Sequence, residues 1–453
     1  MLAVCPRYFK PYLTSRLTTA PFIVTFPISS HPAITVPCSH PSGLVTRDLT
    51  VWYAAPVNQQ KDTIPRLQQL VRHMRDQLIG LRDGATFEEV RLRYIATVDK
   101  LVAEGLGRRT VSRVDDREAY WSPAADILQE CIRLGFVHHR RLPSARRYLE
   151  GYRNKQFELT PTGQEVADSA QNDLGIFYDR LASAVIQAHP YFKHFLVSLS
   201  EAPLVCPEVS EGDVEAGRRQ EKGTDHWARL ASERLNAGPS SQTASLEAVR
   251  QEMGVVVRRR FGNKPLKKPP SKALSEALND AFATVSLRAR GLPMGATELK
   301  MLRAWGSQLR LIDQSRHIPD FEGSNVLWLA AELDESAPDL NSKRRSISER
   351  GAAVASAVVA AYRNQASSDE STLAAPYIPI YKVRAEAAFK CRVTRALVDI
   401  VLEQLANGEY SELGVQVWLH LGRGDQPPPS EPVYRRGGSR RYEITMTNKK
   451  GDR

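Results

Sequence analysis

A change of pattern within residues 124–160 constrains the fold of this chain more than any other feature of its sequence. The first part has apolar residues at one-turn helical spacing, namely Ile127, Leu128, Cys131, Ile132 and Leu134. A Ser-Pro pair at 122–123 precedes them. Because Ser caps helices and Pro is tolerated in the first turn, the pair predicts that a helix begins here. Gly135 ends this helix. Two short extended runs follow at 136–137 and 156–160, with a basic loop between them.

The order of these elements resembles the recognition helix and wing of winged-helix DNA-binding domains. Helix, glycine, apolar pair and basic hairpin are followed by the sequence FELTPTG at 157–163 and then by another helix. The resemblance extends over residues 64–172 and points to no particular family within this superfamily. It implies that two helices expected from apolar periodicity, at 64–81 and 87–102, support the recognition helix. It also implies that the recognition helix reads base edges while the hairpin lies along the nucleic-acid backbone.

The charge of the hairpin is almost entirely basic. Between residues 133 and 155 the only acid is Glu150. The residues predicted to bind phosphates here are Arg133, Arg140, Arg141, Arg146, Arg147, Arg153 and Lys155. Phosphate backbones are bound mainly through such charge, by release of counterions, so the hairpin predicts contact with nucleic acid. The alternative is a solvated basic loop on a winged helix that binds proteins.

Composition is that of an ordinary globular protein, with 453 residues, 42% hydrophobic residues and a net charge of +11. That length suggests two to four domains, and the positive charge favours anionic partners. No apolar run is long enough to span a membrane, so no membrane partner is predicted. The five cysteines are scattered, without a CxxC pair. They indicate a reducing compartment, hence a cytoplasmic protein, nucleoid-associated if the source is bacterial.

The N-terminal and central parts of the chain are predicted as follows. Residues 1–60 are expected to be disordered or an over-extended start, because 1–45 hold no Asp or Glu. A winged-helix module is assigned to 61–200. Residues 201–272 are expected to form a linker and a basic arm, because periodicity is lost there and prolines interrupt the second half. The arm is predicted to be extended and to bind phosphates through Arg258, Arg259 and Arg260. A solvated linker is the alternative.

A helical middle domain is assigned to 273–375. Its order of helix, glycine, strand, loop and strand repeats that of the first module, which suggests a divergent winged helix. Glu298 and Lys300 spell the ExK pattern of a metal-dependent nuclease, but their setting predicts a helix, whereas such a nuclease places the pattern on a strand. The Ala-rich helix expected at 347–362 is suited either to close packing inside the chain or to dimerisation.

The last module, 376–453, has a helix-turn-helix pattern followed by a second hairpin. Helices are expected at 382–389 and 394–405, with Thr394 as the N-cap. Residues 415–421 alternate apolar and polar side chains, which predicts a strand, and 442–447 form its partner. Between them a basic tip is predicted to bind phosphates through Arg435, Arg436, Arg440 and Arg441. This pattern is similar to winged helices, although more weakly.

The sequence therefore predicts a mainly α protein with small β-hairpins, of class α+β. It predicts tandem winged-helix modules joined by helical and linker segments. No phosphate loop, HExxH or GxSxG motif occurs, so no catalytic residue, metal ligand or cofactor is predicted. The expected function is binding of double-stranded DNA, with RNA as the alternative ligand. The chain would act in regulation or as the DNA-reading subunit of a larger complex, such as a defence or restriction system. The rival functions are a winged-helix scaffold for protein assembly, including a homodimer, and a nuclease with an unrecognised centre.

Deletion of residues 1–45 tests the first of these boundaries. The segment lacks both periodicity and acids, so we expect it to contribute no core and its removal to leave the melting temperature unchanged. Thermal unfolding followed by circular dichroism measures this. A fall of several degrees would show that the segment packs against the remainder of the chain.

Overall fold

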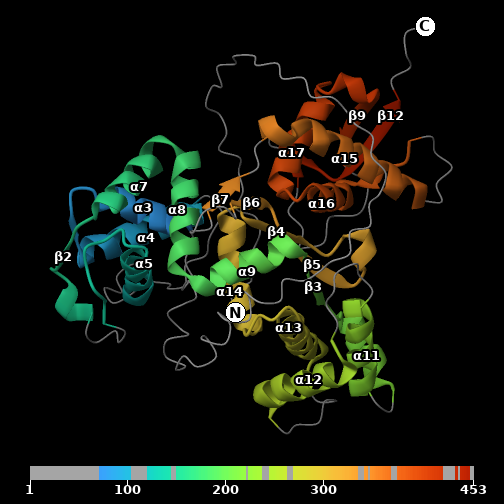
Figure 1. Ribbon diagram of the computed structural model, residues 1–453, viewed down its shortest axis with the longest axis horizontal. Coiled ribbons are helices and arrows are strands. Elements are labelled where there is room, and N and C mark those ends of the chain that lie inside the picture. The colour runs from blue at the N-terminus through green and yellow to red at the C-terminus, as the bar shows by residue number, and fades with distance from the viewer. Residues whose placement is uncertain are drawn as a thin grey trace. The chain divides into compact units, whose positions relative to one another are not determined.

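The chain is mainly helical and also contains small antiparallel sheets (Figure 1). This composition confirms the expected α+β class. The computed structural model describes residues 71–103, 120–143, 149–220, 223–236, 244–262, 269–334, 341–344, 347–368, 375–421, 434–436 and 439–448. These residues all belong to one compact unit. The prediction for 1–60 lies outside the described residues.

Among its described residues, the N-terminal segment has four α-helices, one 3-10 helix and two short strands. They are α3 (Val71–Gly80), β1 (Ala85–Thr86), α4 (Phe87–Ala103), α5 (Trp121–Arg133), η1 (Glu150–Tyr152), β2 (Gln156–Phe157) and α7 (Pro161–Asn172). Strand β2 pairs antiparallel with β1, where Ala85 faces Phe157. Two residues further on, Leu159 forms an antiparallel bridge with Val137. The chain around 156–159 therefore lies between β1 and Val137, and both extended runs predicted from the sequence are confirmed.

Helix α5 begins earlier than its sequence predicts. The Ser-Pro pair at 122–123 lies inside the helix, and Tyr120, in the left-handed conformation, occupies the N-cap position. The prediction that Ser122 caps the helix is wrong. Aromatic packing explains the earlier start, because the ring of Trp121 lies 5.5 Å from that of Phe87 and the ring of Tyr120 lies 5.6 Å from that of Tyr94. Both contacts hold the first turn against α4.

The central segment has a three-stranded sheet surrounded by helices. Its elements are α8 (Leu174–Ala188), α9 (Pro190–Glu201), β3 (Leu204–Pro207), α10 (Glu211–Arg218), α11 (Gly223–Asn236), α12 (Leu246–Phe261), α13 (Ser271–Ala289), α14 (Ala296–Gln308), β4 (Ile312–Ser315), η2 (Pro319–Phe321) and β5 (Ser324–Leu329). The sheet order is β3–β5–β4, and a separate hairpin of β6 (Ala331–Asp334) and β7 (Asn341–Arg344) follows.

The expected linker over 201–272 is wrong for the residues that the structure describes there. Strand β3 and helices α10, α11 and α12 occupy most of this region. Trp227, Val249 and Met253 are buried in a core that also includes α13. These helices are short or weakly amphipathic, so the sequence shows little periodicity, and their stability comes from packing. Residues 258–260, expected on an extended arm, form the last turn of α12 because the prolines come only after Gly262.

The C-terminal segment repeats the combination of helices and a small sheet. It consists of α15 (Ile347–Ser368), β8 (Ile378–Pro379), α16 (Ile380–Cys391), α17 (Arg395–Ala406), η3 (Ser411–Leu413), β9 (Val415–His420), β10 (Tyr434–Arg436), β11 (Ser439–Arg441) and β12 (Glu443–Asn448). The sheet order is β8–β12–β9. Thr394 caps α17 by accepting a hydrogen bond from the backbone N–H of Leu397, as predicted. In α15, Val354, Ala355 and Val358 are buried in one core with α16 and α17.

One order of elements recurs in all three segments. A helix leads into a first strand, two helices separate that strand from a second, and the third strand returns to lie between the other two. The helices before the first strand are α3, α9 and α15, and the central strands are 156–159, β5 and β12. In the central segment, α10, α11 and α12 are additional to this order. The first strand there is β3, so the boundary predicted at residue 273 cuts through the repeated unit.

Strand β5 joins two hydrophobic cores. Every residue of β5 is buried. Leu327 and Leu329 belong to a core that the N-terminal segment shares with α8, α9 and α14 of the central segment, whereas Val326 and Trp328 belong to the core of the C-terminal segment. Because successive side chains of a strand point to opposite faces, β5 presents one apolar face to each core. This explains why its sequence is an almost continuous apolar run.

Gly163 provides a test of the N-terminal packing. A Cβ at this position would overlap the backbone carbonyl of Phe136, and the Gly163 amide donates a hydrogen bond to the Thr160 hydroxyl, at 3.0 Å. Gly163→Ala should therefore lower the free energy of unfolding by about 1–3 kcal/mol, despite the better helix propensity of alanine. Gly151→Ala is the matched control, since no atom lies within 4 Å of a Cβ there. We expect it to be neutral or stabilising by up to about 1 kcal/mol. Equal urea midpoints for the two variants would contradict this packing.

Candidate nucleic-acid interface

The hairpin after α5 is held at its base by backbone contacts and by one side chain of α5. The His138 N–H donates to the carbonyl of Glu158 at 2.9 Å, and the Leu142 N–H donates to Gln129 Oε1 at 2.7 Å. Arg140 and Arg141 lie between these two anchors, and both are exposed. The positions of two exposed cations are therefore fixed by the backbone on either side. Arg146 and Arg147 lie outside the described residues.

The returning side of the hairpin carries Arg153 and Lys155, also exposed. Arg153 Nη2 lies 3.5 Å from Glu88 Oε1. The same carboxylate accepts a hydrogen bond from Arg91, and this bond, followed by the charges of Arg91 and Arg153, holds the pKa of Glu88 below its usual value. Arg153 is thus partly neutralised. Lys155 Nζ lies 4.9 Å from the centre of the Tyr152 ring, a cation–π contact that orients the ammonium group without neutralising it.

His139 completes the base of the hairpin. Its ring lies 5.2 Å from the Phe157 ring and 6.0 Å from the Tyr152 ring. Burial, and then the nearby charge of Lys155, lowers the pKa of His139. The histidine therefore serves as a neutral packing residue near neutral pH, and the positive charge of the hairpin comes from its arginines and Lys155.

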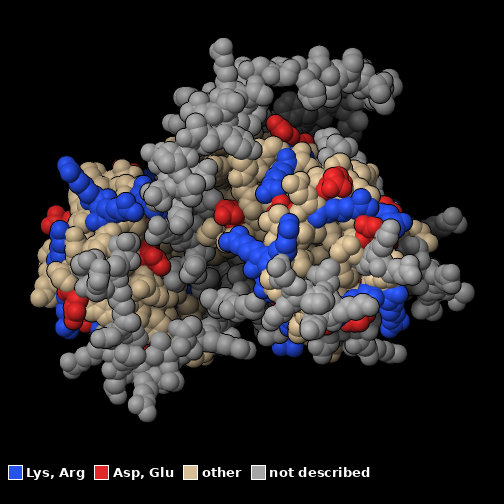
Figure 2. Space-filling view, turned by 90° about the horizontal axis from the view of Figure 1, so that it is seen from below, with Lys and Arg blue, Asp and Glu red and all other residues tan. Residues whose placement is uncertain are grey.

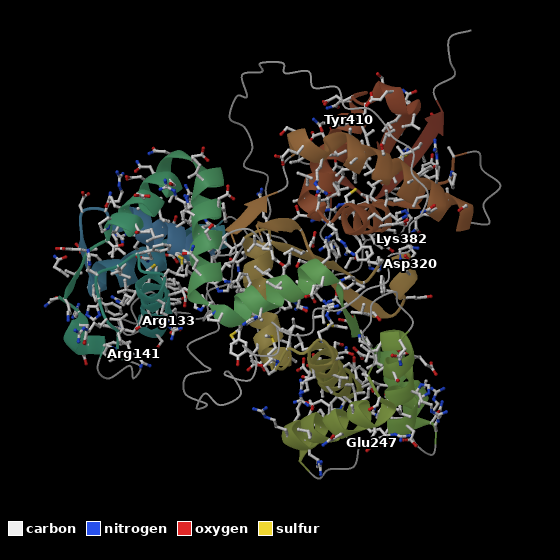
Figure 3. The ribbon with its side chains drawn as sticks, in the orientation of Figure 1. Arg133, Arg141, Glu247, Asp320, Lys382 and Tyr410 are labelled. Carbon is white, nitrogen blue, oxygen red and sulfur yellow. The ribbon has the colours of Figure 1, made fainter. Side chains whose placement is uncertain are left out.

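Arg133 does not belong to this exposed set. Its side chain is only 15% exposed, and Nη1 lies 3.7 Å from Glu130 Oε2. Glu130 is itself buried, and its other carboxylate oxygen lies 2.6 Å from Nε2 of His189 in the cap between α8 and α9. Figure 3 labels Arg133 at the end of α5 and Arg141 on the hairpin. Because its side chain is largely buried beside an internal carboxylate, Arg133 is a poorer candidate for phosphate contact than the exposed cations of the hairpin. No sequence pattern links Glu130 with His189.

The outer face of α5 offers little to a ligand. Of its thirteen residues only Ser122 is exposed. The half-buried positions are Pro123, Asp126, Gln129 and Arg133, and two of these already have internal partners: Gln129 binds the hairpin backbone and Arg133 pairs with Glu130. The helix therefore has no exposed lysine or arginine. A side chain that reads base edges would have to come from elsewhere.

The second predicted basic group lies at the C-terminal end of α12. Arg258 and Arg259 are exposed, whereas Arg260 pairs with Glu276 at 2.6 Å. Cations in the last turn of a helix are stabilised by the helix dipole, which accounts for their position without a ligand. Of this group, Arg258 and Arg259 remain candidates for phosphate contact.

The third basic group is a hairpin of its own. Strands β10 and β11 pair antiparallel, with Arg435 opposite Arg440 and Arg436 opposite Ser439. Arg440 is exposed and Arg441 is half-buried. The side chains of Arg435 and Arg436 lie outside the described residues. Tyr434 anchors the hairpin, since it is buried and the guanidinium of Arg384 lies 5.9 Å from the centre of its ring.

The N-terminus of α17 is closed by the central sheet. The backbone N–H of Arg395 donates to Asp313 Oδ2 at 2.6 Å, and the Arg395 guanidinium lies 2.9 Å from Asp313 Oδ1. Next to this pair, the indole N–H of Trp328 donates to the carbonyl of Val393 at 2.9 Å. Side chains of β4 and β5 therefore contact the first turn of α17 and Val393, which precedes its N-cap. In a helix that reads a DNA groove, the first turn is the part that presents side chains to base edges.

Glu298 and Lys300 have structural partners. They lie on helix α14, as the sequence predicts. Glu298 accepts a hydrogen bond from the backbone N–H of Gly295, which is the half of a capping box that a glycine N-cap allows, and Lys300 pairs with Asp280 at 2.7 Å. These contacts account for both residues without a metal. Within the described residues, no three His, Cys, Asp or Glu side chains are grouped to hold a metal ion.

Figure 2 shows one face of the molecule, where Lys and Arg side chains gather in several separate groups with acidic side chains among them.

Comparisons of the chain with protein-family models, with curated proteins and with solved structures found no match. Among the described helices, none has both the length and the apolar composition needed to cross a membrane.

Asp313 is predicted to be essential for the docking of α17. Asp313→Ala leaves the buried Arg395 guanidinium without its carboxylate, which should lower the free energy of unfolding by about 3–5 kcal/mol. Asp320→Ala is the control, because Asp320 is exposed in η2 (Figure 3) and should change stability by less than about 0.5 kcal/mol. Urea unfolding followed by tryptophan fluorescence compares them. A similar small effect of both substitutions would show that the pair does not hold α17.

Proposed function

We propose that the three repeated segments are winged-helix modules and that the chain binds nucleic acid, duplex DNA in the first place, through its basic hairpins. The support for the fold is the order of elements. In each segment a helix, a strand, two helices and two further strands follow in that sequence, with α10, α11 and α12 inserted after the first strand of the central segment, and the last strand lies in the middle of the sheet. The N-terminal hairpin, 138–155, and the hairpin β10–β11 would then be wings.

The observation that carries the binding proposal is the placement of the exposed cations. Arg140, Arg141 and Lys155 lie on the N-terminal hairpin and are exposed, whereas the only exposed residue of α5 is Ser122. The exposed positive charge of this surface therefore lies on the hairpin, and α5, the helix before it, exposes no lysine or arginine. Such a surface favours phosphate contacts, which position a protein on nucleic acid without reading its sequence.

This distribution of charge also favours one biological role over another. A regulator that selects a short sequence needs several side chains at base edges. A subunit that holds DNA for a larger assembly needs only the phosphates. We therefore place the chain in the second class, as a cytoplasmic DNA-holding subunit, with RNA as the alternative ligand. A protein-binding scaffold remains the rival function.

The salt dependence of duplex binding tests the wing. In the triple variant Arg140→Ala, Arg141→Ala and Lys155→Ala, affinity should fall on every duplex sequence. Each phosphate that a cation neutralises adds about 0.9 to the slope of log K against log salt, so that slope should become shallower by roughly one to three units. Fluorescence anisotropy of a labelled duplex at several salt concentrations measures both quantities.

The matched control removes three positive charges elsewhere, by Arg219→Ala, Arg229→Ala and Arg363→Ala. These three residues are exposed on or beside α10, α11 and α15. The control should leave the slope unchanged. Equal changes in both triple variants would show a response to net charge alone. An unchanged slope in the hairpin variant, with the protein still folded, would rule out the wing and favour the scaffold.

A further inference from the structure

The outer face of the C-terminal sheet carries exposed aromatic side chains. Trp418 is 49% exposed and Tyr377 is 50% exposed. The other tryptophans in the described part of the chain are buried, namely Trp121, Trp227, Trp305 and Trp328. Large aromatic side chains contribute most to stability when they are buried. Their exposure on one sheet face therefore marks this surface as a candidate contact site.

The strand register places these aromatic residues together. Ile444 in the central strand β12 pairs with Ile378 on one side and with Leu419 on the other, and Ile378 and Ile444 are buried. One position along, on the opposite face, Thr445 pairs with Trp418, and Tyr377 lies in the same row because it precedes Ile378. Neighbouring strands are about 4.8 Å apart, so Tyr377 and Trp418 stand about 10 Å apart across the sheet.

His420 fixes the geometry of this face. Its ring lies 4.8 Å from the Tyr377 ring at an interplanar angle of 61°, and its Nε2 lies 2.9 Å from the Thr445 hydroxyl. Tyr377 is thereby held edge-to-face against a neighbour that is itself hydrogen-bonded to the sheet. An ordered aromatic ring loses little conformational freedom when a planar ligand stacks on it, so the face is preorganised for stacking.

Positive charge adjoins the aromatic face. The N–H of Tyr442, the residue just before β12, donates to the carbonyl of His420 at 3.0 Å. Tyr442 directly follows β11, the strand of the hairpin that contains Arg440. Arg440 is exposed, and its register partner is Arg435. One acid, Glu443, lies opposite His420 and is half-buried. The aromatic residues therefore lie on or next to the two strands that flank β12, and Arg440 lies on β11, the strand just before β12 in the chain.

We propose that this face, formed by Tyr377, Trp418 and His420 next to the hairpin β10–β11, binds single-stranded nucleic acid. Unpaired bases stack on the aromatic rings, and the phosphates between them lie toward Arg440. Base–aromatic stacking with a basic groove is the general mode of sequence-tolerant single-strand binding. The bases of a duplex are already stacked on one another and cannot use such a face. The inference rests on the proposed nucleic-acid function and adds a second, structurally separate ligand class.

Binding of a fluorescein-labelled oligo-dT, about 16 nucleotides long, to the full chain tests this. Trp418→Ala and Tyr377→Ala should each weaken oligo-dT binding about tenfold, as expected for the loss of one stacked base. Both variants should bind duplex DNA as the unaltered chain does. Trp418→Phe should retain most of the oligo-dT affinity, because it keeps an aromatic ring. Leu92→Ala, at an exposed apolar position of α4, is the matched control and should change neither affinity.

The outcomes separate this inference from the proposed function. Duplex binding without oligo-dT binding overturns the inference and leaves the wings in place. Unchanged oligo-dT affinity in both alanine variants also overturns it. Binding of neither nucleic acid overturns both proposals. Sedimentation velocity adds one further test: if Trp418→Ala converts an oligomer to a monomer without affecting oligo-dT binding, the face is a contact between copies of the chain and the inference is wrong.

Discussion

The two-sided burial of β5 is the constraint on which the rest of the structure depends. A strand that presents Leu327 to one core and Trp328 to another couples those cores, because it cannot shift along its neighbours without moving both sets of side chains. The indole of Trp328 extends the coupling to the turn before α17 through its hydrogen bond to Val393. The neighbouring strand β4 adds Asp313, which binds Arg395. One sheet therefore holds the C-terminal segment at the first turn of α17.

Sequence predicted the elements whose signals are local. The N-cap at Thr394 and the alternation in 415–421 each depend on residues within a few positions, and the structure contains both, with the strand ending at His420. The hairpin after α5 was found in the same way, from the glycine and apolar pair before it. Arg140 and Arg141 of this hairpin are exposed, and their contact with phosphates stays a prediction.

The failures concern interactions between distant residues. Strand β3 was missed because four residues between helices give no periodicity, and its partner β5 lies far along the chain. Arg133 looked like one more basic residue of the hairpin, but its charge is held by Glu130, whose other partner is His189. Residues 258–260 were expected on an extended arm because prolines follow, although the helix ends before the prolines begin. In the first two instances tertiary contacts, absent from any local pattern, determined the outcome.

The way polar groups are used inside the chain limits how it can recognise a ligand. Helix α5 uses Gln129 and Arg133 for internal contacts, and α17 uses Arg395 in the same way. Side chains engaged in buried pairs cannot turn outward to base edges without leaving an uncompensated charge behind, which costs several kcal/mol. What stays exposed are arginines on hairpins and aromatic rings on a sheet. Both kinds of group recognise features common to all nucleic acids, phosphates and base faces, so the proposed modules favour binding that tolerates any sequence.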